Sequence, residues 1–150
     1  MALLQITEPS KSKDLYNKKY YIGIDLGTTN SLVALMKDGS PTILKDENNK
    51  ELFPSVVNYK KDSIFVGDSL NDGTFITFRS IKRMIGKNIN DLNNENFYFP
   101  CDYISEDNII KFKAFDRLVT PIEISSEILK HLKKITEEKL QGEIAGCVIT

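Results

Sequence analysis

The hydrophobic residues near the N-terminus fall into two short runs on either side of a polar turn. Residues 21–34 read YIGIDLGTTNSLVA, and the runs before Asp25 and after Asn30 are rich in β-branched and aromatic side chains. Such residues favour strands, and two short strands around a glycine-bearing turn are typical of a β-hairpin. The pattern therefore predicts a hairpin whose turn is formed by residues 26–29.

Further short apolar runs predict more strands, joined by polar turns. The expected strands lie near residues 42–44, 55–59, 64–66, 98–104, 109–114 and 145–150. Asp38 and Gly39 form a typical turn pair, and Asn49 in the polar loop 46–51 belongs to a residue type that tolerates left-handed backbone. The segment 86–96 is rich in asparagine. It is predicted to be a loop.

In residues 120–140 the apolar residues are spaced as in an amphipathic helix and not as in a strand. Thr120 and Glu123 have the spacing of a capping box, and Pro121 stands at the first helical position. One face of this helix carries a stripe of apolar residues, namely Ile124, Ile128, Leu132 and Ile135. We expect this stripe to pack on a sheet. His131 lies off the stripe without a partner at metal-ligand spacing, so it is predicted to face solvent.

Charge and composition exclude several classes of function. Twenty basic residues stand against 21 acidic ones, which gives a net charge of −1. The chain therefore has no electrostatic footprint for nucleic acid or for an anionic membrane. Its apolar runs are far too short to span a bilayer. Residues 1–6 lack the basic start and the long apolar centre of a secretory signal, so we expect a cytoplasmic protein.

The two cysteines do not indicate a zinc or redox centre. Cys101 and Cys147 lie far apart, without the C-x-x-C spacing of such sites. Cys147 falls in an apolar strand pattern, where cysteine behaves as a small hydrophobic residue.

The hairpin turn carries groups that suit a phosphate site. Gly27 is expected to adopt positive φ and to let the backbone approach a large anion, while Thr28 and Thr29 can donate N–H and O–H hydrogen bonds to phosphoryl oxygens. Asp25, at the strand end, can reach Mg²⁺ directly or through its water shell. An ordinary hairpin with an Asp-x-Gly turn explains these residues equally well. The motifs GxxxxGK[ST] and GxGxxG are absent from the sequence, so the P-loop and Rossmann classes lose support.

The segment GIDLGTTNS, residues 23–31, closely resembles the first phosphate motif of the actin-like ATPases, and in particular of the 70-kDa heat-shock chaperones related to DnaK. Three later segments resemble motifs of this family in the same order: FPSVV at 53–57, FVG at 65–67 and IKRMIG at 81–86. Sugar kinases and actins share the hairpin but not the last segment. The chaperone assignment therefore depends mostly on the later motifs.

Three more segments narrow the resemblance to one branch of the family. MALLQITEP at 1–9, TPIEISSEIL at 120–129 and GEIAGCVIT at 142–150 are similar to the HscA branch, which serves iron–sulfur cluster assembly. The resemblance thus runs from one end of the chain to the other. In that branch a scaffold partner holds the cluster, so neither cysteine is expected to bind it.

The resemblance implies an α/β fold of the actin-like ATPase type, a ribonuclease H-like mixed sheet with helices. Residues 1–17 are expected to form a loosely ordered leader, and residues 18–150 an incomplete first lobe. Within this lobe, residues 18–36 and 117–150 would form an inner subdomain and residues 37–116 an outer one. The segment 68–80 is shorter than its family counterpart, so the outer subdomain is expected to be trimmed there.

The resemblance also implies a function, an ATP-driven chaperone for the maturation of iron–sulfur cluster proteins. The residues that hold the phosphates would be Gly27, Thr28, Thr29 and Asn30, the last through its backbone N–H. Asp25 would orient hydrated Mg²⁺, and Lys82 would lie beside the γ-phosphate and assist hydrolysis. The implied partners are a J-domain co-chaperone and an iron–sulfur scaffold protein, with neither nucleic acid nor a membrane.

Family members are several times longer than 150 residues and add a second lobe and a peptide-binding domain. Residues 1–150 are therefore expected to lack most of the ATP site and to be inactive alone. Two alternatives stay open. One is a degenerate remnant without catalysis, and the other is a fragment of a non-chaperone actin-like kinase.

Overall fold

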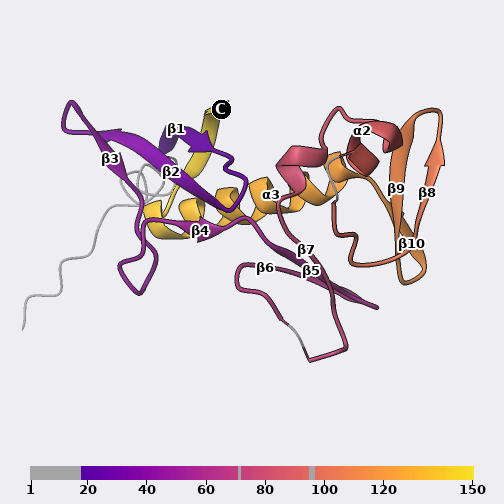
Figure 1. The fold of residues 1–150 in the computed structure, drawn as a ribbon. Coiled ribbons are helices and arrows are strands. Elements are labelled where there is room, and N and C mark those ends of the chain that lie inside the picture. The colour runs from indigo at the N-terminus through magenta and orange to yellow at the C-terminus, as the bar shows by residue number, and fades with distance from the viewer. Residues whose placement is uncertain (1–17, 71, 95–96) are drawn as a thin grey trace, which may run out of the picture.

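The computed structural model describes residues 18–70, 72–94 and 97–150 (Figure 1). The expected leader, residues 1–17, lies outside this range. The elements are β1 (Lys19–Asp25), β2 (Asn30–Lys37), β3 (Ser40–Ile43), β4 (Phe53–Pro54), β5 (Val57–Lys60), β6 (Ser63–Val66), β7 (Ile76–Phe78), the 3₁₀ helix η1 (Ile81–Met84), α2 (Ile89–Asn94), β8 (Tyr103–Glu106), β9 (Ile109–Ala114), β10 (Arg117–Val119), α3 (Pro121–Leu140) and β11 (Glu143–Ile149).

The predicted hairpin is confirmed and forms the centre of a mixed sheet. β1 and β2 pair antiparallel, with Ile24 opposite Val33. β1 also pairs in parallel with β11, which gives the strand order β11-β1-β2-β3, with the short β4 on β2. We call these strands the hairpin sheet. The β2–β3 turn has positive φ at both Asp38 and Gly39, the geometry that suits a two-residue hairpin, and Asn49 is left-handed as predicted.

Two three-stranded sheets, β6-β5-β7 and β10-β9-β8, lie between β4 and α3 in the chain. The strands expected near residues 55–59, 64–66 and 109–114 are present, whereas the one expected over 98–104 begins only at Tyr103. The sequence pattern does not predict β7 or β10, which have three residues each. The pairings of β3 with β2 and of β10 with β9 cross the expected subdomain limits at residues 36 and 117. The division into two subdomains remains a prediction.

The long helix α3 begins and ends where the sequence predicts. The Thr120 hydroxyl accepts the Glu123 N–H at 3.2 Å, and the Glu123 carboxylate accepts the Thr120 N–H at 2.7 Å, which completes the capping box. Gln141 closes the helix in a left-handed conformation. The predicted stripe faces the core, since Ile124, Ile128 and Leu132 are buried and Ile135 is half-buried. Figure 1 shows α3 running across the molecule, from β10 at its start to the hairpin sheet at its end.

The prediction of a loop over residues 86–96 is wrong, because α2 occupies part of it. Asn88 begins this helix as an N-cap. Its side-chain oxygen accepts the N–H groups of Asn90 at 2.9 Å and Asp91 at 3.1 Å, while the Asp91 carboxylate accepts the Asn88 N–H. Asparagine is a favoured N-cap residue, so part of the composition that suggests a loop here starts a helix instead.

Five aromatic rings join the two smaller sheets and form what we call the aromatic cluster. Its members are Tyr59, Phe78, Phe99, Tyr103 and Phe112, with neighbouring ring centroids between 4.8 and 5.8 Å apart. Phe78 in β7 lies between Tyr59 in β5 and Phe112 in β9. Burial raises the pKa of Tyr59 to about 12, helped by the negative charges of Glu127 and Glu123 on α3.

Candidate phosphate-binding site

The hairpin turn is tight, and its glycine is required for a reason other than the expected one. Gly27 does not have positive φ, which corrects the sequence-based expectation. A Cβ at this position would lie 1.9 Å from the carbonyl oxygen of Asn30, a distance that no side chain can adopt. By contrast, a Cβ at Gly23 in β1 would meet nothing within 4 Å. Because the two sides of the turn approach so closely, any larger residue at position 27 would force the backbone to shift.

Backbone hydrogen bonds fix both sides of the turn. On one side, the Leu26 N–H donates to the Thr150 carbonyl at 3.1 Å, and the Thr150 N–H donates to the Ile24 carbonyl at 3.0 Å. On the other side, the Ser55 N–H donates to the Thr29 carbonyl at 2.8 Å. These bonds hold the turn to two other parts of the chain, at Thr150 and at Ser55.

A buried pair of hydroxyl groups strengthens the second side of the turn. The side chains of Ser31 in β2 and Ser55 after β4 lie 2.8 Å apart, and both residues are buried. Sequence reasoning assigns no role to either serine. The available signal is a small hydroxyl residue within each apolar strand pattern, where a buried polar group needs a partner.

The polar side chains of the turn are not used by the fold. Asp25, Thr29 and Asn30 are exposed, and Thr28 is half-buried. Within residues 18–70, 72–94 and 97–150, no side-chain hydrogen bond or ion pair involves any of these four residues. A carboxylate, two hydroxyls and the N–H groups of residues 27–29 thus remain available to a ligand. This donor set suits phosphoryl oxygens, with the carboxylate suited to hydrated Mg²⁺.

Lys82 lies on a different element from the turn. It is exposed on η1, whose other side carries the buried Ile81 and Met84. The residue before η1, Ser80, is left-handed with φ 53°, and it has no side-chain capping bond. Figure 1 shows η1 and the β1–β2 turn on the same side of α3 in that view. Among the described residues, the Lys82 ammonium makes no hydrogen bond or ion pair. The structure thus groups the turn residues in one place, whereas Lys82 lies on η1, which packs on α3.

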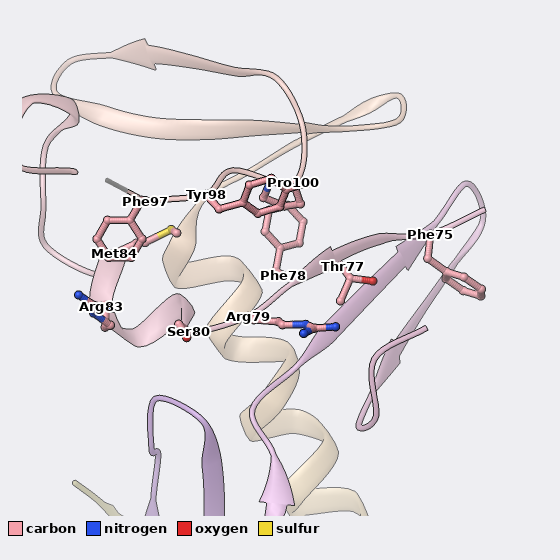
Figure 2. Close-up of a pocket in the computed structure, with 10 residues that line it drawn as sticks. All are labelled: Phe75, Thr77, Phe78, Arg79, Ser80, Arg83, Met84, Phe97, Tyr98 and Pro100. Carbon is pink, nitrogen blue, oxygen red and sulfur yellow. The ribbon is translucent and has the colours of Figure 1, made fainter. Parts of the chain in front are cut away.

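Among the cavities that the described residues form, two of similar size lie away from the turn. Figure 2 shows one of about 570 Å³ between β7, η1 and residues 97–100, with Arg79, Tyr98 and Met84 among its walls. The other, of about 550 Å³, lies between α3 and the loop before β4. Neither is lined by the turn residues 25–30.

His131 lines the second cavity and is half-buried, so its predicted place on a solvated face is wrong. Burial, together with the nearby charge of Lys134, lowers the pKa of His131 below its usual value.

One of the two cysteines departs from its sequence pattern. Cys147 lies in β11 as expected but is exposed, whereas Cys101 is half-buried. Burial is the main cause that raises the pKa of Cys101, to about 11, so this thiol stays protonated at neutral pH.

Within the part of the chain that the structure describes, there is no group of three metal-ligating side chains that could hold an ion. None of the described helices is long and apolar enough to cross a membrane.

Comparison with known proteins agrees with this fold and turn. The sequence model of the Hsp70 protein family matches residues 21–150. A chaperone protein HscA homolog from Pasteurella multocida (strain Pm70) is 39% identical over 155 aligned residues, and one from Vibrio parahaemolyticus is 43% identical over 157. Each alignment covers all of this chain but 25% of the relative, so the chain spans about a quarter of the length of these curated relatives.

The mixed sheet with helices and the hairpin turn define part of an actin-like ATPase lobe. The chain belongs to the Hsp70 family, and its similarity within that family is to HscA chaperones. The family match also weighs against the non-chaperone kinase considered above.

Proposed function

We propose that this chain carries the phosphate-binding part of an ATP-driven chaperone. The observation that carries the proposal is the β1–β2 turn. Gly27 brings its two sides together, backbone bonds hold it at both sides, and its polar side chains have no partner among the described residues. A fold that fixes a polar turn and leaves its donors free has a preorganised anion site, because no bonds must break before the ligand binds.

Each residue of the turn has a role in this proposal. The N–H groups of the turn and the hydroxyls of Thr28 and Thr29 hold phosphate oxygens, and Asn30 contributes its backbone N–H. Asp25 orients the water shell of Mg²⁺. When bound, Mg·ATP supplies the phosphoryl group whose transfer to water releases the energy for the chaperone cycle. The Lys82 ammonium offsets negative charge and orients the attacking water.

The finer function follows the branch of the family. We propose that the chaperone acts in the maturation of iron–sulfur cluster proteins, with a J-domain co-chaperone that stimulates hydrolysis and a scaffold protein as its client. The support is the similarity to HscA homologues along the whole chain. The leader motif at residues 1–9 also supports this branch from sequence, although it lies outside the described residues.

The decisive experiment uses a chimaeric chaperone in which this chain replaces the matching residues of an HscA homologue. Lys82→Ala should lower single-turnover hydrolysis by about 100-fold or more, because it removes stabilisation of the transition state. ATP affinity should stay within a few-fold, as measured by calorimetry, while Asp25→Asn should weaken the magnesium dependence of both binding and hydrolysis.

The controls separate this proposal from its rival. Lys61→Ala removes an exposed lysine between β5 and β6 whose side chain makes no hydrogen bond or ion pair among the described residues, and it should leave hydrolysis unchanged. Equal turnover in the Lys82→Ala chimaera would remove Lys82 from the mechanism. A chimaera with the unaltered chain that folds but does not bind ATP would instead support the degenerate remnant.

A further inference from the structure

A buried amide side chain of β5 forms hydrogen bonds with the segment between β6 and β7. Asn58 in β5 is only 1% exposed. Its amide nitrogen donates to the carbonyl oxygens of Asp68 at 3.0 Å and Phe65 at 3.4 Å. Its oxygen accepts the Leu70 N–H at 3.0 Å and the Thr77 hydroxyl at 2.8 Å. Every donor and acceptor of this carboxamide is therefore engaged.

The partners of Asn58 show what it holds in place. Asp68 and Leu70 belong to the stretch that follows β6, and Thr77 is the central residue of β7. The Thr77 hydroxyl also lies 3.0 Å from the Leu70 carbonyl oxygen. Asn58, Leu70 and Thr77 are therefore all in mutual contact. This stretch is the one that the sequence indicates to be shorter than its family counterpart. The side chain of Asn58 thus fixes the shortened segment to β5.

β7 connects this network to Lys82. It is a three-residue strand whose one neighbour in the sheet order is β5, with Asn58 opposite Thr77. After Phe78, two residues lead into η1, and the second of them is the left-handed Ser80. A short edge strand has few backbone bonds, so its side-chain anchor contributes much of its order.

We propose that Asn58 is a positioning residue for Lys82. Through Thr77 it holds β7, and β7 sets where η1 presents the Lys82 ammonium. This inference rests on the proposed function, in which Lys82 assists hydrolysis. Asn58 itself touches neither the turn nor any reacting group, so its effect on the reaction passes through η1.

The first test measures local order in the 150-residue chain by amide hydrogen exchange. The reporters are the N–H groups of Arg83 and Ile85, which donate to the carbonyl oxygens of Ser80, before η1, and of Lys82, within it. Asn58→Ala should speed their exchange by roughly tenfold or more. Exchange of the Leu26 N–H, in the hairpin sheet, should stay within about twofold. A rise of equal size at all sites would overturn the proposal, because it would mean that Asn58 acts on global stability alone.

Two variants of Thr77 keep this test decisive if Asn58→Ala does not fold. Thr77→Val keeps the branched shape but removes the hydroxyl, and it should speed exchange at Arg83 and Ile85. Thr77→Ser keeps the hydroxyl and should restore slow exchange. Asn90→Ala is the matched control, since Asn90 is exposed on α2 and its side chain makes no hydrogen bond among the described residues. Slow exchange in Thr77→Val would refute the inference.

The second test asks whether the effect reaches the reaction. In the chimaeric chaperone, Asn58→Ala should lower the single-turnover rate several-fold at unchanged ATP affinity. In a Lys82→Ala background the same change should add nothing, because both act through one group. An equal loss in both backgrounds would refute a role through Lys82. If η1 loosens in the exchange test while Lys82→Ala hydrolyses ATP normally, the proposed function fails and only the local anchoring by Asn58 remains.

Discussion

The hairpin sheet and the aromatic cluster bury their hydrophobic residues in different ways. In the hairpin sheet one face carries the buried Ile22, Ile24 and Val33. On the opposite face, Tyr21 is 76% exposed and Val148 is 69% exposed. The rings of the aromatic cluster pack on one another between two sheets. The region that carries the candidate phosphate site is therefore the one that is covered on a single face. Sites that bind ligands are commonly drawn from the less stable parts of a structure.

The largest effect is expected where both regions depend on the same helix. Leu132 on α3 is fully buried, and Leu132→Ala should lower the free energy of unfolding by about 2–5 kcal/mol. Urea unfolding followed by far- and near-UV circular dichroism should show both regions lost together. Ile122→Ala, on the same helix but at a residue that is 67% exposed, should change stability by less than about 0.5 kcal/mol. A hairpin sheet that melts separately from the ring signal would show that the two regions do not share α3.

The next effect is confined to the hairpin sheet. Gly27→Ala should destabilise it by about 1–3 kcal/mol, because the added methyl group overlaps the Asn30 carbonyl and forces the turn to shift. Gly23→Ala is the matched control in the adjoining strand β1, where the methyl group meets nothing within 4 Å. Thermal unfolding of both variants measures the difference. Equal melting temperatures would mean that the turn relaxes freely and is not preorganised.

A smaller effect concerns the start of α3, beside the aromatic cluster. Thr120→Ala removes the N-cap and should cost about 1 kcal/mol. Hydrogen bonds from the Thr120 N–H, and then from its hydroxyl, hold the pKa of Glu123 below its usual value. A lowered pKa in the folded state means that this contribution is present above the ordinary glutamate pKa and is lost as the pH falls through the folded value. The variant should therefore show a weaker loss of stability in acid than the unaltered chain, and an unchanged acid profile would contradict the capping role.

The smallest effect on stability should accompany a clear effect on association. β11 forms one edge of the hairpin sheet and carries neither lysine nor proline, the residues that commonly protect an edge. Val148→Lys should change unfolding by less than about 0.5 kcal/mol but reduce self-association and the binding of a hydrophobic dye. Leu118→Lys in β10 places the same charge in the other region and should change neither. A chain that stays monomeric without the Val148 substitution would contradict this prediction.

Local signals explain which elements could be predicted from the sequence. The hairpin and α3 each have a local sequence signal. For the hairpin it is a turn between two short apolar runs, and for α3 it is a capping box before an apolar stripe. α2 was not predicted, because asparagine is common both in loops and at the N-cap of helices. β7 has no pattern of its own, because three residues become a strand only through pairing with β5 and through the side chain of Asn58.

The candidate site shows the same limit. The importance of Gly27 is predictable from its place in the turn, but the reason is not, since the nearness of the Asn30 carbonyl depends on the folded backbone. The serine pair and the bonds of Thr150 join residues that are distant in sequence, so no local pattern reveals which residues are partners. Lys82 was found through resemblance to a family, the structure places it on η1, and its role in hydrolysis stays a prediction.

The parallel pairing of β1 with β11 has a consequence for synthesis on the ribosome. β1 emerges just before β2, whereas β11, the strand that completes its other edge, follows only after α3. At ordinary rates of translation the nascent chain waits roughly 6 to 25 seconds between the two strands. Throughout that interval one side of β1 has no partner strand, and the base of the turn lacks its bonds to Thr150. The residues of the candidate phosphate site, which are synthesised early, thus acquire their final shape late, when β11 has been made.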